Sequence, residues 1–492
     1  MTVGRGYKAY PGGVRPLGLL LVASCGRIGF DTFGGDAGNG ESGQPPDACV
    51  PRMLDASTSL PTAFGVYGTA GADLAKQIVA TTDGFVVAGQ LQSSVTIGGR
   101  VLATAGSIDI FMLGLDAAGG VRWARTIISG GGSETPIGMA VDDADNFYVV
   151  GNMDGSIDCG GGPLPVVGLQ AAYVCSFDVN GQHRWSRSFG GPVASPGGSN
   201  DAASGVTIAN DVVTVAGNVH GPVDFGGGMT AASGTGFDGY VAAYRASDGG
   251  FLRVRRFGLT GVTDPQRVVA DRSGGTYVVG WFGGSVDLGR GAITSRGEDV
   301  FVIAYDAAGE PRWSTTIDST TDEAPRGLAI DDAGIYVLGY FDGPSSLALG
   351  TLSLTSPGHR DGFAAALTHD GAPRWLAGIG GSGCGRFEDA VTARCGELVV
   401  AGAFAGSLQF AGTQLVSAGG SDGLVAGFDT DGTPRWIRSH GGIGEDGAVG
   451  VALIDGTSVL SVGFRDAAGS ICGGLTAFSE RDLAIDITTV PP

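Results

Sequence analysis

The chain has 492 residues, of which 92 are glycine and only 16% are charged, and its formal net charge is −20. Glycine at this frequency is typical of low-complexity chains, but here the glycines separate short apolar segments, which indicates many tight turns. The acidic balance and the lack of a basic stripe disfavour binding to a phosphate backbone, so we expect no nucleic-acid partner.

Residues 1–24 have the order of a lipoprotein signal peptide, because basic residues come first and the apolar stretch Leu17–Ala23 follows. The small residues before Cys25 resemble a lipoprotein cleavage site, which implies that Cys25 is the lipid attachment residue. Ordinary signal cleavage is the alternative. Gly26 lacks the acid that favours retention at the inner membrane, so we expect an exported protein lipid-anchored at the outer membrane or cell surface. Residues 25–57 predict a flexible Gly/Pro-rich tether.

A hairpin of fifteen residues recurs along the chain, and Asp299–Trp313 (DVFVIAYDAAGEPRW) is its clearest copy. Alternating apolar residues, a turn with Asp and Gly, and a returning strand with Trp indicate two antiparallel strands. Copies of the same length are Asp109–Trp123, Ala171–Trp185, Asp361–Trp375 and Asp422–Trp436. A longer variant spans Asp238–Val254, with Val254 where Trp is expected. We expect Trp to pack between neighbouring units as core.

A short β-branched strand that ends in glycine provides the second repeat, and its mean spacing is about 62 residues. Its seven copies end at Gly89, Gly151, Gly217, Gly280, Gly339, Gly402 and Gly463. They predict an all-β protein, a seven-bladed β-propeller of four-stranded blades over residues 58–492. Strand 58–64 has no blade of its own, so we expect this N-terminal strand to complete the last blade and close the ring.

The unit RW…GG-x-G-x-D…VYVxG…D-G-F…D-x-x-G-x-x-RW resembles the seven-bladed β-propeller repeat (SBBP) family of bacterial envelope proteins. The resemblance covers roughly residues 58–490. It implies an exported propeller that serves as a binding platform and shares no common catalytic residues.

Six cysteines remain besides Cys25, and an even number in an exported chain favours disulfides. The repeat places Cys159 and Cys175 on successive strands of one blade, and Cys384 and Cys395 around the inner strand of another. Cys49 and Cys472 would then lock the seam of the ring. We expect no metal at these cysteines, since the chain has no CxxC pair.

Acidic residues recur in the segments that enter the inner strands, and we expect these segments to surround one mouth of the central channel. The candidates are Asp73, Glu134, Asp201, Asp264, Glu323, Asp389 and Asp446. Local capping of turns is one interpretation. The other is a ring of negative potential that binds calcium or a cationic partner. The acid-rich turns at 142–146 and 429–432 are weak calcium candidates, because neither has the length or closing Glu of an EF-hand.

No motif indicates catalysis. Gly419–Gly423 fits GxSxG but precedes a strand without the strand–turn–helix context of a hydrolase. We therefore predict a non-enzymatic envelope lipoprotein, monomeric and without cofactor, whose propeller binds a protein or a surface polysaccharide. It contacts the membrane only through the lipid. The alternatives are a glycan-active enzyme with acids at the channel mouth and a calcium-dependent adhesin.

Overall fold

The computed structural model describes residues 64–67, 73–105, 108–117, 119–128, 130–191, 201–232, 236–356, 359–392, 397–441, 444–454, 458–466 and 481–489. They belong to one compact unit, Pro51–Pro492. The predicted signal peptide, Cys25 and the tether lie outside the described residues. Within the described ranges no helix has the length and apolar character needed to cross a membrane.

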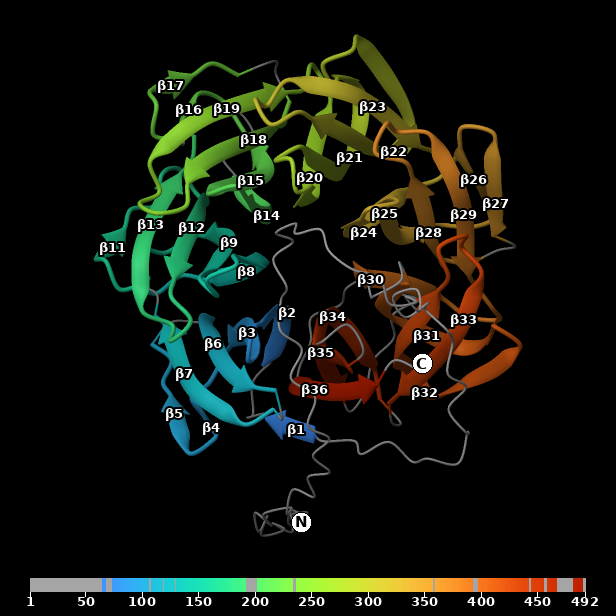
Figure 1. The fold of residues 1–492 in the computed structure, drawn as a ribbon, viewed down its shortest axis with the longest axis horizontal. Coiled ribbons are helices and arrows are strands. Elements are labelled where there is room, and N and C mark those ends of the chain that lie inside the picture. The colour runs from blue at the N-terminus through green and yellow to red at the C-terminus, as the bar shows by residue number, and fades with distance from the viewer. Residues whose placement is uncertain are drawn as a thin grey trace, which may run out of the picture. The chain divides into compact units, whose positions relative to one another are not determined.

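Six blades, A to F, each consist of four consecutive antiparallel strands that run from the centre outwards (Figure 1). Blade A consists of β2 (Leu74–Thr81), β3 (Gly84–Leu91), β6 (Asp109–Asp116) and β7 (Val121–Ile127). Blade B consists of β8 (Glu134–Val141), β9 (Phe147–Met153), β12 (Ala171–Phe177) and β13 (His183–Phe189). Blade C consists of β14 (Ala202–Ala209), β15 (Val212–Val219), β18 (Asp238–Arg245) and β19 (Phe251–Phe257). Blade D consists of β20 (Val262–Ala270), β21 (Thr276–Asp287), β22 (Ala292–Tyr305) and β23 (Pro311–Ile317). Blade E consists of β24 (Glu323–Asp331), β25 (Gly334–Phe341), β28 (Asp361–Leu367) and β29 (Pro373–Ile379). Blade F consists of β30 (Gly385–Thr392), β31 (Leu398–Phe410), β32 (Thr413–Phe428) and β33 (Pro434–His440).

A further four-stranded sheet joins the two ends of the chain. Its strands are β34 (Asp446–Ile454), β35 (Ser458–Asp466), β36 (Arg481–Thr489) and β1 (Phe64–Tyr67). Each inner strand contacts the inner strand of the next blade, and β34 contacts both β30 and β2, so the ring is closed. The expected closure by the N-terminal strand is present at Phe64–Tyr67, which pairs with β36, and residues 58–63 of the predicted strand lie outside the described residues.

The predicted fold class therefore needs a correction. Six sheets are blades in the full sense, each built from one unbroken unit of the repeat, and we count six blades rather than seven equivalent ones. The remaining sheet is a composite, because its outer strand comes from the opposite end of the chain. The sequence analysis counted this sheet as a seventh equivalent blade because its glycine-containing strand has the same pattern as those of the other blades.

The blades also carry an outer hairpin that the sequence analysis did not predict. In blades A, B, C and E it is a separate two-stranded sheet: β4 (Val95–Ile97) with β5 (Arg100–Leu102), β10 (Ile157–Asp158) with β11 (Pro163–Leu164), β16 (Val223–Asp224) with β17 (Met229–Thr230), and β26 (Ser345–Leu349) with β27 (Leu352–Ser356). In blades D and F the second and third strands themselves extend to form it.

The recurrent glycine lies inside the second strand, not at its end. Gly89 is the sixth residue of β3, and β3 continues to Leu91. A Cβ at Gly89 would lie 2.1 Å from the carbonyl oxygen of Leu74, because the inner strand has a β-bulge opposite this position. The glycine is therefore required by the close approach of two backbones.

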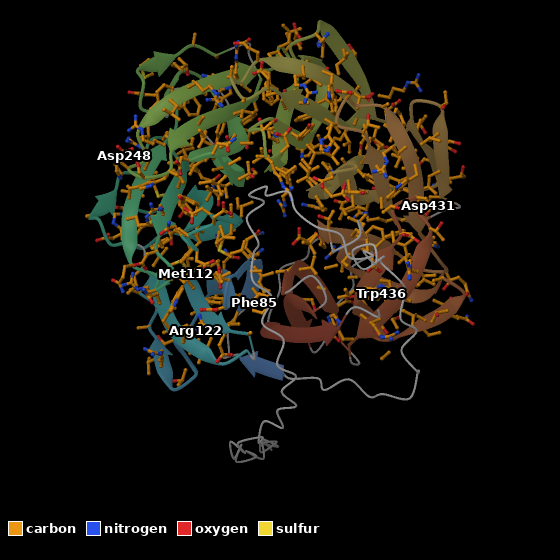
Figure 2. All side chains as sticks on the ribbon, viewed as in Figure 1. Phe85, Met112, Arg122, Asp248, Asp431 and Trp436 are labelled. Atoms are coloured by element: carbon orange, nitrogen blue, oxygen red, sulfur yellow. A yellow bond between two sulfur atoms is a disulfide. The ribbon has the colours of Figure 1, made fainter. Side chains whose placement is uncertain are left out.

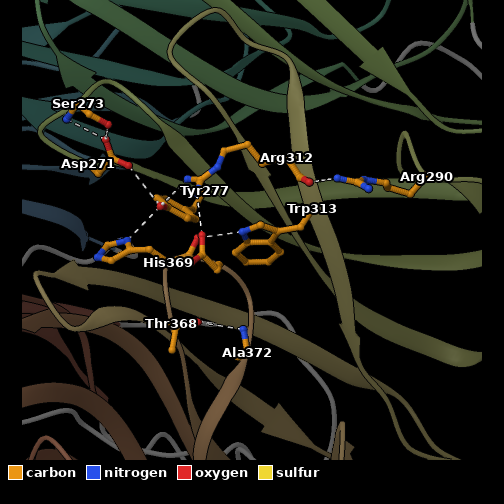
Figure 3. Close-up of polar contacts among 10 residues, drawn as sticks. Asp271, Ser273, Tyr277, Arg290, Arg312, Trp313, Thr368, His369 and Ala372 are labelled. Carbon is orange, nitrogen blue, oxygen red and sulfur yellow. Dashed lines mark hydrogen bonds and ion pairs between the residues drawn. The ribbon is translucent and has the colours of Figure 1, made fainter.

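Tryptophan packs between blades, as predicted. At the junction of blades D and E, the indole Nε1 of Trp313 donates to the carbonyl of His369, 2.9 Å away, in the turn of the next blade (Figure 3). Tyr277 joins the same junction by hydrogen bonds to Asp271 and His369. Equivalent bonds reach the next blade from three other tryptophans: Trp123 to Val179, Trp185 to Ala246 and Trp375 to Thr430.

Blade C departs from this pattern at a position that the sequence analysis assigned wrongly. In the strand register, Trp313 pairs with Ala304, and the equivalent Ala243 pairs with Arg253. Arg253, not Val254, therefore replaces the tryptophan. The turn of this hairpin is one residue longer than in the tryptophan hairpins: six residues lie between the paired Tyr244 and Phe251, and five between Tyr305 and Pro311.

Apolar and acidic residues separate as expected for a propeller. Phe85 and Met112 lie inside the packed sheets, whereas Asp248 and Asp431 lie on turns at the periphery (Figure 2). A backbone hydrogen bond from Gly250 lowers the pKa of Asp248, and the Thr433 side chain lowers that of Asp431. These acids cap turns, which supports the interpretation that much of the acidity serves local structure.

Candidate functional site

A β-bulge lies near the start of the inner strand in every sheet of the ring. The bulged residues are Lys76, Ile137, Ser204, Gln266, Arg326, Glu388 and Val449. We call the end of the ring at which the inner strands begin the bulge face. A bulge changes the direction of its side chain and frequently lies next to a functional site. The same backbone feature thus presents different side chains around the channel.

The side chains on the bulge face differ sharply between two parts of the ring. At the bulged residue, the residues two before and one after it, and the paired residue of the second strand, blades B and C carry no ionisable group. We call this set the neutral arc: Thr135, Ile137, Gly138, Asn152, Ala202, Ser204, Gly205 and Asn218. The equivalent positions and their neighbours in blades D to F form the charged arc: Asp264, Gln266, Arg267, Trp281, Glu298, Arg326, Tyr340, Arg360, Arg386, Glu388 and Asp389.

Glu388 links two arginines of the charged arc. Its Oε1 lies 2.5 Å from the Nε of Arg386, and its Oε2 lies 3.9 Å from the Nε of Arg326. The Glu388 side chain is 17% exposed, whereas that of Arg326 is 37% exposed. Burial lowers the pKa of Arg326, but the negative charge of Glu388 together with the contributions of Tyr340 and Asp264 outweighs it, and the net direction is upward. Arg326 is therefore a permanently charged group that still reaches solvent.

Tyr340 holds two guanidinium groups in place. The Cζ of Arg360 lies 4.3 Å from the centre of its ring and the Cζ of Arg326 lies 5.4 Å from it. Arg360 also makes a bidentate ion pair with Asp342, with distances of 2.7 and 3.3 Å. Stacking and bidentate pairing both orient arginine, so these cations are held in defined positions.

Asp264 lies at the opposite end of the arc, in blade D. Burial raises its pKa to about 7, although the positive charge of Arg326 and hydrogen bonds from Trp281 and Gln266 act against the rise. A carboxyl group that changes charge near neutral pH in a recess is typical of a functional site.

Arg267 and Asp389 interact electrostatically across blade E. Gly327 lies between them, and a Cβ there would come within 3.0 Å of the Cα of Asp389. Burial raises the pKa of Asp389 to about 6 against the charge of Arg267, and its Oδ2 accepts a hydrogen bond of 3.0 Å from the amide of Val451. The glycine therefore lets charged side chains from blades D and F approach each other.

Five of the predicted channel-mouth acids are buried rather than exposed. They are Asp73, Glu134, Asp201, Glu323 and Asp446, with exposures of 0 to 2%. Asp201, for example, accepts hydrogen bonds from the amides of Gly191 and His220. Asp73 accepts one from Gln92 and Glu323 one from Ser319. Capping therefore accounts for them better than an exposed ring of negative potential.

The other two predicted acids, Asp264 and Asp389, occupy different positions and belong to the charged arc. In the strand register Thr263 and Gly385 stand where the five buried acids have their equivalents. The five buried acids stand three residues before the bulged residue, whereas Asp264 stands two before it and Asp389 one after it. Sequence spacing alone did not resolve these small offsets.

One predicted disulfide is present. Cys159 is bonded to Cys175. Cys384 is also disulfide-bonded, whereas its predicted partner Cys395 and the pair Cys49 and Cys472 lie outside the described residues. Among the described residues no group of three or more His, Cys, Asp or Glu side chains has the arrangement of a metal site. In the turn at 142–146, Asp142 instead accepts hydrogen bonds from Ala144 and Asn146.

No family model matches this chain, and no curated protein sequence matches it. Among solved structures, BamB from Moraxella catarrhalis aligns with 86% of this chain and 100% of its own at 12% identity, with a TM-score of 0.35. A quinohemoprotein alcohol dehydrogenase from Comamonas testosteroni aligns with 86% and 76%, at 9% identity and TM-score 0.38. A europium-containing methanol dehydrogenase aligns with 86% and 93%, at 10% identity and TM-score 0.41. With such low identities and scores, these likenesses support no function for this chain.

The sequence analysis missed most of the charged arc, including Trp281, Arg326, Tyr340 and Glu388. A signal was available: these residues stand at fixed offsets from the recurrent glycine, where other units have small or neutral residues. The motifs common to all repeat units indicate the fold, whereas the functional signal lies in the residues that differ between units at equivalent positions.

Proposed function

We propose that this protein is a non-enzymatic β-propeller scaffold of the cell envelope that binds a partner protein at the charged arc. The observation that carries the proposal is the break in symmetry at the bulge face. The turn acids and interblade contacts recur around the ring, whereas Arg326, Tyr340 and Trp281 have no counterpart at the equivalent positions of blades B and C. Side chains that differ at equivalent backbone positions are therefore the best candidates for recognition.

The chemistry of the arc suits a protein partner. Arginine, tryptophan and tyrosine are the residue types that contribute most to binding energy at protein interfaces. Arg326 and Arg360 are oriented before any partner binds, because Tyr340 and Asp342 already hold them. Preorganised side chains lose little conformational entropy on binding. A partner with both acidic and basic groups would complement Arg326 on one side and Asp264 and Glu298 on the other.

The cellular placement follows from the sequence. The export signal and Cys25 support a lipid-anchored protein, and the residue after Cys25 favours the outer membrane. The resemblance to the SBBP family supports an envelope protein. The tether would hold the propeller away from the membrane so that its bulge face is accessible.

A glycan-active enzyme is the second candidate. The observation in its favour is that two carboxyl groups of the arc, Asp264 and Asp389, have raised pKa values, about 7 and about 6. A general acid requires such a shift. Both carboxyl groups already have hydrogen-bond and charged partners within the propeller, so we rank the enzyme below the scaffold.

The proposal is tested by chemical cross-linking in intact cells with an affinity-tagged chain, followed by mass spectrometry. We expect one partner protein with the wild type and its loss with Arg326→Ala/Arg360→Ala. The matched control is Arg100→Ala/Arg290→Ala, which removes two arginines that donate to backbone carbonyls of the outer strand. It should retain the partner. Retention on isolated envelope polysaccharide without any protein partner would contradict the proposal.

A further inference from the structure

The junction of blades C and D contains a cavity at the position that tryptophan fills in other junctions. Its volume is about 60 Å³, and Arg253 and Thr276 both line it. A second cavity of about 10 Å³ adjoins the same two residues. The cause is a double replacement. Arg253 stands at the tryptophan position, and Thr276 stands where the equivalent residue of blade B is Phe147.

The effect of this replacement is clear from the junction of blades A and B. There, Trp123 stacks on Phe147 with ring centres 5.8 Å apart. At the junction of C and D, the Nη2 of Arg253 donates to the carbonyl of Ala307 at 3.0 Å, the same turn position that tryptophan reaches elsewhere. The hydrogen bond between blades is thus preserved, whereas the aromatic volume is not.

The guanidinium of Arg253 has more N–H donors than hydrogen-bond partners among the described residues. Among the described residues, Ala307 is its one hydrogen-bond partner, and a guanidinium has five N–H donors. Its electrostatic neighbour Asp306 caps its own turn, accepting hydrogen bonds from the amides of Ala308 and Glu310. No acidic residue is among the described residues that line either cavity.

The rest of the wall combines hydroxyl groups with small apolar side chains. Thr214 and Thr276 stand beside Arg253, and Ala209, Val212 and Ala270 form the apolar part. A water molecule needs roughly 10–15 Å³ of such volume, so the cavity holds about four to six atoms of that size. Acetate has a number of non-hydrogen atoms within this range, a charged end that matches a guanidinium and a methyl end that matches alanine and valine.

We propose that this cavity binds a small monocarboxylate, of the size of acetate, with its carboxylate on Arg253 and the two threonine hydroxyls and its alkyl end against Ala209, Val212 and Ala270. The site lies at the end of the ring opposite the bulge face, on the hairpin turns. It is independent of the proposed partner site. Its ligand is either a free metabolite or the carboxylate of a larger molecule, which share this chemistry.

The test is a titration of the purified chain with acetate at constant ionic strength, followed by calorimetry and by the thermal unfolding midpoint. Acetamide, which has the same shape without the charge, is the matched ligand. We expect saturable binding of one acetate per chain and none of acetamide. Equal effects of both, or an acetate effect no larger than that of chloride, would overturn the proposal.

Two variants locate the site. Arg253→Trp/Thr276→Phe gives this junction the residues of the junction between A and B, and Arg253→Gln removes only the charge. Both should lose acetate binding at least tenfold. Arg187→Gln is the control, because Arg187 also donates to a turn carbonyl of the next blade, that of Gly249, but does not line the cavity. Binding that survives in both Arg253 variants, or that is lost equally in the control, would place the ligand elsewhere and overturn the assignment. A longer carboxylate such as butyrate separates the two sources of the ligand. If butyrate binds, the cavity admits the carboxylate of a larger molecule. If butyrate does not bind, the ligand is a free small acid.

Discussion

The neutral arc and the charged arc have the same backbone at the bulge face and different side chains on it. Both have a β-bulge at the same register, and both place glycine after a bulge where neighbouring inner strands approach closely. Only the charged arc orients arginines on an aromatic ring and buries carboxyl groups beside them. The comparison teaches that features shared by all blades report on folding, whereas features confined to one arc report on function.

The largest effect is expected where the two arcs are alike. Gly205→Val and Gly327→Val each place a side chain against the next inner strand, with Cβ distances of 3.0 Å to the Cα of Arg267 and of Asp389. Overpacking against backbone costs about 2–3 kcal/mol of unfolding free energy, and we expect similar losses for both. Urea denaturation of the two variants measures it. A loss confined to one arc would show that their backbones are not equivalent.

The second prediction concerns the point at which the arcs differ. Glu388→Ala leaves Arg326 and Arg386 without their shared carboxylate. Because Arg326 is partly exposed, we expect a loss of about 2 kcal/mol rather than the full cost of a buried unpaired charge. The equivalent change in the neutral arc, Ser204→Ala, removes one neutral hydroxyl from a buried position and should cost no more than about 1 kcal/mol. Equal effects of the two substitutions in urea denaturation would remove the distinction between the arcs.

A smaller effect is expected from pH. Folded Asp264 keeps its proton up to about pH 7, whereas the unfolded chain releases it near pH 4. Between these values the unfolded state binds fewer protons, so the free energy of unfolding falls as pH rises from about 4 to about 7. Above that window the contribution of Asp264 is lost.

Asp264→Asn should remove this part of the pH dependence. Urea midpoints at pH 4.5 and 7.5 test it against the wild type. Glu323, whose pKa burial raises to about 8, acts in the same direction and remains in the variant, so a reduced fall is the expected result. An unchanged fall would mean that Asp264 does not hold the proton.

The smallest effect is expected outside both arcs. Arg100 is exposed on β5, and its guanidinium donates to the carbonyl of Arg122 at 2.9 Å. Arg100→Ala should change the unfolding free energy by no more than about 0.5 kcal/mol. This measurement also validates the arginine control used for partner capture. A larger loss would disqualify that control.

The fold could be predicted from the sequence because period and turn chemistry recur in every unit. The hairpins, the tryptophan junctions and the disulfide of Cys159 with Cys175 follow from that pattern. What failed depends on register. In the hairpin of blade C, a difference of one residue in register places Arg253, rather than Val254, at the tryptophan position. The composite sheet was counted as an ordinary blade.

The site was less predictable than the fold. Acids at similar spacings proved to be of two kinds, because strand register buries Asp73 and its equivalents as caps and leaves Asp264 half-buried in the arc. Trp281 and Tyr340 stand out only by their departure from the repeat, since aromatic residues are common in strands. Their meaning depends on the neighbours that the ring brings together from blades D, E and F.

The central claim is that recognition takes place at the charged arc, and a photo-cross-linking residue placed at matched bulge positions tests it directly. Gln266 of blade D and Ile137 of blade B occupy equivalent, partly exposed sites in the two arcs. In intact cells we expect a protein adduct through position 266 and none through position 137. Equal adducts at both positions, or an adduct through position 137 alone, would contradict the account.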